Sequence, residues 1–361
     1  MIFNFLSENS DKENHSKLLS LAKHGDANAQ YDLGEAYYHG KGVDKDLFEA
    51  VKWYKLAADQ GYAPAQNALG YCYSIGNGIE QDYDEAVRYY RLAAVQGYAE
   101  SQYHLGNAYY FGYSVDKDYA EAVKWYRLAA DQGHAKAQYS LGDVYYFARS
   151  VDKDYAEAVK WYRLAADQGL ADPQFNIGYC YSHGQGVNKD CTEAVRWWKL
   201  AAEQGHAKAQ FNLGDYYYFG HGVDKDYAEA ARWWKLAAEQ GEVKSQFNLG
   251  CSYHYGQGVD QDYTEAVKWY RLAVEQGNAA AQCNLGLCYA QGLGVDQDYT
   301  EAVRWWKLAA EQGQVTAQRD LGICYRKGYG VEKNDTEALK WVKLAADQGD
   351  EKAKRLYQKW L

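Results

Sequence analysis

Proline is nearly absent from this sequence, with two residues among 361. Because proline removes a backbone donor and breaks helices, its scarcity permits many uninterrupted helices. Long hydrophobic runs are missing as well, and no segment approaches the ~20 apolar residues of a membrane helix. Basic residues are outnumbered, with 39 Lys and Arg against 49 Asp and Glu and a formal net charge of −10. An acidic surface repels phosphate, which argues against nucleic acids and anionic membranes as partners.

The N-terminal residues do not form a secretory signal. Residues 1–6 are followed at once by polar and charged residues, whereas a signal needs a basic start, ~7–15 apolar residues and a small-residue cleavage site. The sequence therefore predicts a cytoplasmic protein. The alternatives are a leader that precedes this sequence and export without an N-terminal signal.

Cysteine spacings typical of zinc sites and redox motifs are also absent. Of the seven cysteines, Cys72, Cys180, Cys288 and Cys324 share one position of an internal repeat, where a small buried side chain is expected. Equivalent positions in stacked repeats lie ~10 Å apart, beyond the ~7 Å limit between bridged Cα atoms. We therefore expect free thiols and a reducing compartment.

Catalytic motifs are not convincing either. Residues 114–117 and 150–153 spell Ser-x-x-Lys, but each serine replaces a turn glycine and the other motifs of that enzyme class are missing. The carboxylates of residues 116–121 lack the glycine and the distal glutamate of a calcium loop. The nine histidines are scattered without metal-ligand spacing. We expect no enzyme activity, no cofactor and no metal.

What the sequence does contain is a strict internal repeat. A Leu-Gly or Ile-Gly pair recurs every 36 residues without insertion or deletion, and its glycines are Gly34, Gly70, Gly106, Gly142, Gly178, Gly214, Gly250, Gly286 and Gly322. A period of 20 to 50 residues indicates a solenoid or a propeller. Within residues 27–62, small and apolar residues follow helical spacing in two halves, separated by the turn residues 40–43. Each repeat is thus predicted to be a helix–loop–helix unit.

The second helix of each repeat has clear start and stop signals. Asp46 followed by Glu49 resembles a capping box. Gly61 stands where a helix ends in a left-handed residue. The position of Gly34 should let the two helices approach closely. The large aromatic residues at the positions of Tyr37 and Trp53 should fill the core between repeats.

These residues also carry a family resemblance. The residues Leu33-Gly34-Glu-Ala-Tyr37 resemble the first helix of a tetratricopeptide repeat. The 36-residue length, the loop Gly-x-Gly-Val-x-x-Asp-Tyr and residues 121–133 resemble its Sel1-like variant. The resemblance implies an all-α, right-handed superhelical solenoid that acts as a protein-binding adaptor. Cysteine-rich secreted relatives carry a disulfide at the positions of Ala58 and Gln66, which this sequence excludes.

The resemblance also gives domain boundaries. We expect an N-terminal capping helix within residues 1–26, in which residues 11–24 are helical. Nine repeats should follow over residues 27–350, and a C-terminal capping helix over residues 351–361. Polar caps at both ends favour a monomer.

Positions that vary between repeats are predicted to be free of packing duties. By resemblance, those two, five and six residues after the repeat leucine line a concave groove. The candidate partner-binding residues are Tyr71, Asn107, Tyr110, Phe111, Asp143, Tyr146, Phe147, Tyr179, Asp215, Tyr218, Phe219 and His254. Aromatic rings beside carboxylates suit a protein or peptide with basic residues. Alternatively, the phenylalanines fill the seam between the first helices of neighbouring repeats.

Three functional hypotheses stay open at this point. The first is a non-catalytic scaffold, the second a secreted or delivered bacterial effector that uses the same surface, and the third a hydrolase. Two local features add expectations of their own. Arg319, Arg326 and Lys327 predict a basic patch in the last repeat. Ser114 and Ser150 replace a loop glycine, and each costs up to ~1 kcal/mol if that position needs a positive φ.

Overall fold

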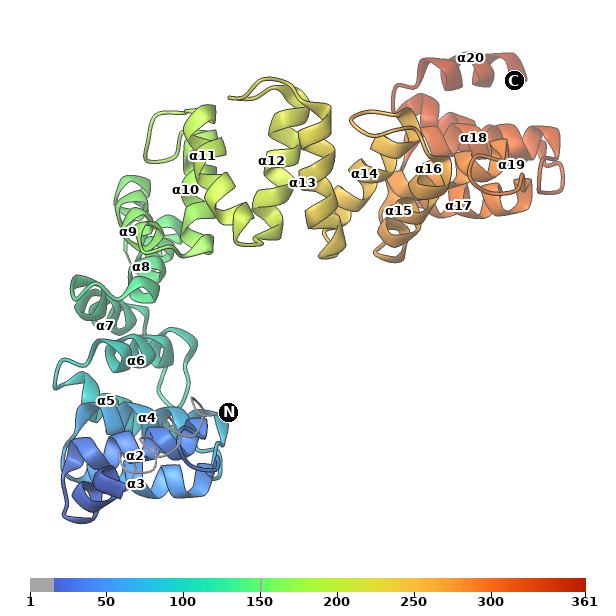
Figure 1. The fold of residues 1–361 in the computed structure, drawn as a ribbon. Helices are drawn as coiled ribbons and strands as arrows, with labels where there is room; N and C mark the ends of the chain where they lie inside the picture. Colours follow the sequence, from blue (N-terminus) through green and yellow to red (C-terminus); the bar gives the residue numbers. More distant parts are fainter. Residues whose placement is uncertain (1–15, 150) are drawn as a thin grey trace, which may run out of the picture. The chain divides into compact units, whose positions relative to one another are not determined.

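The computed structural model describes residues 16–149 and 151–361, and helices dominate these residues (Figure 1). They contain no strand. The chain divides into two compact units that are described separately below. The first comprises residues 1–173 and 185–187, as far as they are described, and the second comprises residues 174–184 and 188–361. The predicted all-α repeat architecture is confirmed.

Each repeat contributes a first helix (A) and a second helix (B). The A helices are α2 (Ala27–His39), α4 (Ala63–Ile75), α6 (Ala99–Phe111), α8 (Ala135–Phe147), α10 (Ala171–His183), α12 (Ala207–Phe219), α14 (Val243–Tyr255), α16 (Ala279–Gln291) and α18 (Val315–Lys327). The B helices are α3 (Leu47–Asp59), α5 (Tyr83–Ala94), α7 (Tyr119–Asp131), α9 (Tyr155–Asp167), α11 (Cys191–Glu203), α13 (Tyr227–Glu239), α15 (Tyr263–Glu275), α17 (Tyr299–Glu311) and α19 (Asp335–Asp347).

Further helical segments flank the repeats. Residues 16–23 are helical, and the part of the predicted N-terminal helix before residue 16 lies outside the described residues. Helix α20 (Glu351–Trp360) follows the last repeat. Its Ala353 is buried, and Leu356, Tyr357 and Trp360 pack beside it against Val342 of α19. This contact covers the last B helix.

The B helices begin at the predicted aspartates. The Asp46 Oδ1 accepts hydrogen bonds from the backbone N–H of Phe48 and of Glu49, both at 3.0 Å. The second hydrogen bond of the predicted capping box, from the backbone N–H of Asp46 to the Glu49 side chain, is not formed. That N–H donates to the Tyr37 carbonyl at 3.0 Å, and Glu49 pairs with Lys52. The aspartate therefore starts helix B and also ties it to helix A of the same repeat.

Helices A and B of one repeat meet at the repeat glycine, as predicted. A Cβ atom added at Gly106 would lie 2.5 Å from Cδ1 of Tyr126, whose side chain is 2% exposed. Gly34 meets Tyr54 in the same way, again at 2.5 Å. The space that a side chain would fill is therefore occupied by a ring of helix B.

Neighbouring repeats are joined by aromatic packing and by buried glutamines. Trp269 lies in the same buried cluster as Trp234 of the preceding repeat, which confirms the predicted aromatic core. The Gln210 Nε2 donates to the Ala202 carbonyl of the preceding repeat at 3.0 Å, and its Oε1 accepts from Gln240 Nε2 at 2.7 Å. The glutamines at this position, each at most 5% exposed, are Gln30, Gln66, Gln102, Gln138, Gln174, Gln210, Gln246, Gln282 and Gln318.

The glutamine position coincides with the disulfide position of the cysteine-rich relatives. Gln66 Nε2 donates to the Ala58 carbonyl at 3.2 Å. A hydrogen bond thus links these repeats where those relatives have a covalent bridge. All seven cysteines are free, as predicted. Burial raises the pKa of the Cys72 and Cys180 thiols to about 12, which disfavours their reactive thiolate forms.

Two loop residues other than glycine adopt the left-handed conformation. Ser114 has φ 52° and Ala148 has φ 57°, whereas Gly42 and Gly40 occupy the corresponding positions of the first repeat at φ 74° and 70°. The expected positive φ is therefore confirmed for Ser114, while Ser150 lies outside the described residues. Both side chains strain the loops that carry them.

We predict that Ser114→Gly and Ala148→Gly each raise the free energy of unfolding by about 0.5–1 kcal/mol, because relief of strain exceeds the added entropy of the unfolded chain. Urea denaturation followed by circular dichroism measures the change. Ala68→Gly, in the middle of α4, is the control and should destabilise by about 1 kcal/mol. A loss of stability in both loop variants would contradict the strain.

Candidate functional site

Three of the five predicted residues two positions after the repeat leucine, Asn107, Asp143 and Asp215, carry structural hydrogen bonds. Each of these three accepts from an aromatic side chain of helix B in its own repeat. The bonds run from Tyr126 to Asn107 (2.7 Å), from Tyr162 to Asp143 (2.7 Å) and from Trp234 to Asp215 (3.1 Å). The inference that variable residues lack packing duties is wrong at this position. A polar residue here pairs with a Tyr or Trp nineteen residues later, a signal that the sequence contains.

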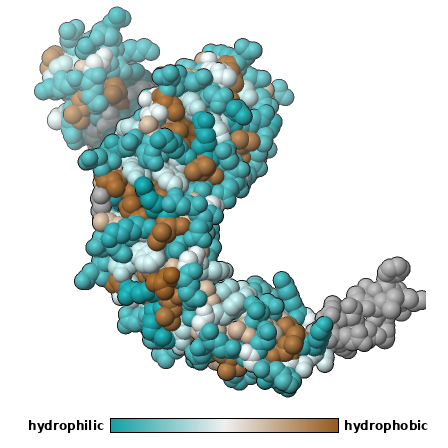
Figure 2. Space-filling view, turned by 90° about the vertical axis from the view of Figure 1, so that its left-hand side faces the viewer, coloured by the Kyte–Doolittle hydropathy of each residue, from teal (hydrophilic) through white to brown (hydrophobic). Residues whose placement is uncertain are grey.

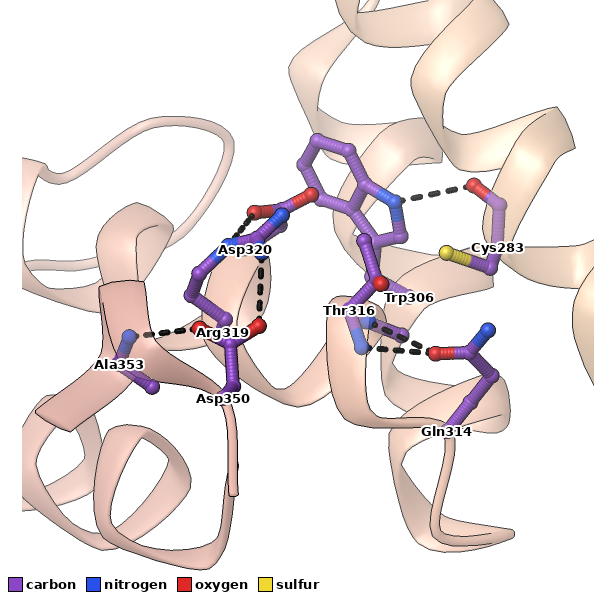
Figure 3. Close-up of polar contacts among 9 residues, drawn as sticks. Cys283, Trp306, Gln314, Thr316, Arg319, Asp320, Asp350 and Ala353 are labelled. Atoms are coloured by element: carbon purple, nitrogen blue, oxygen red, sulfur yellow. Dashed lines mark hydrogen bonds and ion pairs between the residues drawn. The ribbon is translucent and has the colours of Figure 1, made fainter. Parts of the chain in front are cut away.

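In two repeats, those of Leu287 and Tyr179, the aromatic donor of helix B binds a backbone carbonyl and not the residue at this position. In the repeat that carries Leu287, the Trp306 Nε1 donates to the Cys283 carbonyl at 3.1 Å (Figure 3). In the repeat of Tyr179, Trp198 donates to the Phe175 carbonyl in the same way. An acid or amide at this position is therefore one of several acceptors for the aromatic donor of helix B, since the Tyr90 hydroxyl donates to the Ser74 Oγ at 3.5 Å.

The predicted phenylalanines are solvent-exposed. Phe111, Phe147 and Phe219 are 55%, 57% and 60% exposed, so they do not fill a seam between A helices. Each ring contacts the half-buried tyrosine that precedes it. These tyrosines are Tyr110, Tyr146 and Tyr218, with ring centroids 4.8, 4.9 and 5.0 Å from their phenylalanines.

His254 is not the surface residue that we predicted. It is 7% exposed, its Nδ1 lies 3.9 Å from the Cys288 Sγ, and burial lowers its pKa. Tyr255 lies against it, with ring centroids 4.6 Å apart. The imidazole is shorter than the tyrosine found at this position in other repeats, and it stays below the surface.

Clefts lie between successive A helices within each unit. One of them, of about 570 Å³, lies between α12 and α14 and brings together the predicted residues Asp215, Tyr218 and Phe219. A second, of about 540 Å³, lies between α10 and α12 and contains Tyr179, Asp215 and Phe219. In the first unit, a cleft of about 330 Å³ contains Tyr71 and Asn107, and Tyr71 is 42% exposed.

Six aromatic rings surround the cleft between α12 and α14. They belong to Phe211, Tyr218, Phe219, Trp234, Phe247 and Tyr255. The groove positions predicted from the sequence include three of them, Tyr218, Phe219 and Tyr255. The rings that were missed are Phe211 and Phe247, each the fifth residue of its A helix, and Trp234 of helix B. In the face of the protein drawn in Figure 2, hydrophobic residues likewise gather in separate patches within a mostly hydrophilic surface.

Asp215 supplies the carboxyl of this cleft, and Lys244 is a second charged residue that lines it. Its Oδ1 accepts from Trp234 and also from Asn248 Nδ2 at 3.2 Å. Burial raises the pKa of Asp215 to about 6, and the bond from Trp234 lowers it in part. Burial raises the pKa of Asp143 to about 6 as well.

We predict that these two acids make the fold more stable as pH falls from 7 to 5. Because the folded-state pKa is about 6 and that of an unfolded aspartate is about 3.9, the ionised carboxyls destabilise the fold at pH 7. Protonation below pH 6 removes this penalty. The variants Asp143→Asn and Asp215→Asn should each be more stable than wild type at pH 7, and the difference should shrink towards pH 5.

Thermal unfolding at both pH values measures this difference. Each variant is compared with wild type because His254 also responds to pH. Burial lowers the pKa of His254, so a fall from pH 7 to pH 5 destabilises the fold through this residue in all of these proteins. Near Asp215 the charged groups are Glu242 and Lys244, and they too are present in both proteins. An equal difference at pH 7 and pH 5 would contradict the prediction.

The basic patch predicted for the last repeat is wrong for two of its three residues, Arg319 and Arg326, while Lys327 is exposed. Arg319 is held by Asp320 (2.9 Å) and by Asp350 (2.8 Å), which precedes α20 (Figure 3). Arg326 pairs with Asp335 at 3.0 Å. These carboxylates come from the neighbouring residue, from α19 and from the residue before α20, and they neutralise the charges of the two arginines.

Other kinds of site are not found in the described part of the chain. It holds no group of three or more His, Cys, Asp or Glu residues that could bind a metal ion. None of the described helices combines the length and the apolar character that crossing a membrane requires.

The Sel1 repeat family model matches nine consecutive segments of the sequence: residues 27–62, 63–98, 99–134, 135–170, 174–206, 207–242, 243–278, 279–314 and 315–350. The chain belongs to the Sel1 repeat family. Members of this family are in general non-catalytic scaffolds for protein–protein interaction. The clefts described above are therefore found in a chain whose family in general binds proteins.

Two solved structures of Sel1-type proteins resemble this chain over most of its length. One is a protective antigen of uropathogenic Escherichia coli with an SLR fold, 33% identical over 96% of this chain and 91% of the antigen, with a TM-score of 0.60. The other is a Sel1 repeat protein from Oxalobacter formigenes, 34% identical over 85% of this chain and 89% of that one, with a TM-score of 0.63. A search of curated proteins found no match.

Proposed function

We propose that this Sel1 repeat protein is a non-catalytic scaffold that binds a segment of a partner protein on the face formed by its A helices. The resemblance to tetratricopeptide arrays predicts that this face is concave. One observation carries the proposal. Three residues predicted from the sequence, Asp215, Tyr218 and Phe219, lie together in the cleft between α12 and α14.

The chemistry of this cleft supports protein binding. Phe219 and Tyr255 contribute to the cleft and are 60% and 59% exposed. Exposed aromatic residues around a cleft are typical binding hot spots, because a partner removes their large apolar surface from water. A mainly apolar lining with few polar groups is likewise typical of binding clefts.

We further propose that the partner segment is basic and that the scaffold acts as a monomer in the cytoplasm. The net charge of −10 favours a basic partner over an acidic one. An exported effector would use the same surface, so that alternative concerns location and leaves the binding mechanism unchanged. Cell fractionation of the native organism separates the two.

The test is an affinity pull-down from lysate of the native organism, read by mass spectrometry. A double variant, Phe219→Ser with Tyr255→Ser, is compared with the control Phe48→Ser, which changes a 71% exposed phenylalanine on α3. We expect a partner that wild type and control both capture and that the double variant loses. Circular dichroism confirms that all three are folded.

A second variant tests the other aromatic group of the same face. It changes Tyr110, Phe111, Tyr146 and Phe147 to serine. If this variant loses the partner and the α12–α14 variant keeps it, the site lies on the first unit. If both variants captured the partner as well as wild type does, binding on the A-helix face would be refuted.

A further inference from the structure

The cleft between α12 and α14 contains a half-buried acid whose carboxyl is only partly satisfied by hydrogen bonds. Both hydrogen bonds to Asp215 go to Oδ1, and no described residue donates to Oδ2 or forms an ion pair with this carboxyl. An ionised carboxylate away from water is unfavourable unless a donor or a cation compensates it. At the same position Asn107 accepts the helix B hydrogen bond without any charge. The negative charge of Asp215 is therefore not needed for the fold.

The walls of the cleft suit a cation. The Trp234 and Tyr218 rings have centroids 5.3 Å apart, and the rings of Phe211, Phe219 and Phe247 also line the space. The negative faces of aromatic rings attract ammonium and guanidinium groups, and more strongly when water is excluded. One cation already uses this feature, since the Lys244 Nζ lies 5.6 Å from the Phe211 ring centroid.

The volume and the charge of the cleft restrict which chemical group can bind there. A volume of about 570 Å³ admits a long side chain together with part of its backbone. An anion would meet Asp215 and the nearby Glu242. An apolar side chain would bury the carboxylate without compensating it, which disfavours that ligand.

We infer that this cleft receives a single basic side chain, a lysine or an arginine of the bound segment, with Asp215 as its counter-ion and the aromatic rings as its walls. The inference deepens the proposed function and rests on it. Asp215 contributes one free oxygen, which matches one N–H donor of the incoming group. Lys244 lies on the rim and repels that group.

The test uses peptides whose chemistry is known. The probes are N-acetylated, C-amidated Ala-Lys-Ala and Ala-Arg-Ala, with the norleucine analogue of the first as the uncharged control of similar shape. The reporter is the indole N–H signal of Trp234 in ¹⁵N-labelled full-length protein, since this N–H is bonded to Asp215. We expect a saturable shift with a basic peptide and none with the norleucine peptide.

Three variants make the test specific. Asp215→Asn keeps an oxygen for Trp234 and removes the charge, and it should weaken binding at least tenfold. Asp59→Asn changes the net charge equally at the exposed end of α3 and should leave the affinity unchanged. Lys244→Met removes the competing cation and should strengthen binding. Lowering the pH from 7 to 5 should weaken binding about tenfold, because the pKa of Asp215 is about 6.

Several results would overturn the inference. They are a norleucine peptide that binds as well as the lysine peptide, failure of both basic peptides, or an unchanged affinity in Asp215→Asn. Failure of the inference is distinguishable from failure of the scaffold proposal. A natural partner that is lost by the Phe219 and Tyr255 double variant but kept by Asp215→Asn would preserve the scaffold and refute the basic side chain.

Discussion

Replacing Gly106 by alanine should lower the free energy of unfolding by about 2–4 kcal/mol, because an added methyl group overpacks the contact with helix B. The new Cβ would lie 2.5 Å from one atom of the Tyr126 ring and 2.6 Å from the next. That ring is almost fully buried and also donates to Asn107, so it cannot move without losing its hydrogen bond. In open space, the same change inside a helix would stabilise by roughly 0.5–1 kcal/mol.

The matched control is Gly133→Ala. Gly133 has φ +87° and no atom within 4 Å of an added Cβ, so its cost is backbone strain alone, about 1–2 kcal/mol. Chemical denaturation followed by far-UV circular dichroism compares both variants with wild type. If Gly106→Ala were as stable as wild type, the contact between helices A and B would be looser than the structure shows.

Replacing Gln210 by leucine should cost about 2 kcal/mol, because buried amide and carbonyl groups lose hydrogen bonds that water cannot replace. The substitution keeps the size of the side chain approximately. It removes the bond to the Ala202 carbonyl of the preceding repeat and the acceptor for Gln240. Since repeats contact their sequence neighbours alone, amide hydrogen exchange should rise most around α11, α12 and α13.

Gln261→Leu is the matched control for this prediction. Gln261 also makes two hydrogen bonds, to the His254 carbonyl (2.8 Å) and to the Tyr263 hydroxyl (3.0 Å), but its side chain is exposed. Water can take over both partners, so the expected cost is below about 1 kcal/mol. Equal costs for the two glutamines would show that burial of the Gln210 bonds contributes little.

The candidate site was predictable in part. Phe219 was selected because it varies between repeats and follows the repeat leucine by six residues, and its 60% exposure agrees with that choice. His254 was selected by the same kind of rule and is buried. The rule fixes the direction in which a side chain leaves its helix. How far the side chain reaches past its neighbours depends on its length and on rings such as that of Tyr255.

The sequence by itself determined the local structure of this protein. The 36-residue period, the aspartates that start the B helices and the glycines that end them act within a few residues, so their consequences follow from spacing and backbone geometry. The family resemblance follows from the same local pattern. Contacts within one repeat, such as that between Gly106 and Tyr126, were predictable as a close approach of two helices.

The tertiary structure alone decided which groups from different repeats share one environment. Arg319 looked like part of a basic patch until Asp350 was placed beside it. Asp215 was predicted to be free of packing duties, but α13 and α14 bring Trp234 and Asn248 to its carboxyl and form a cleft around it. Charge and hydration depend on what surrounds a group in three dimensions, and a repeat pattern in one dimension does not contain that information.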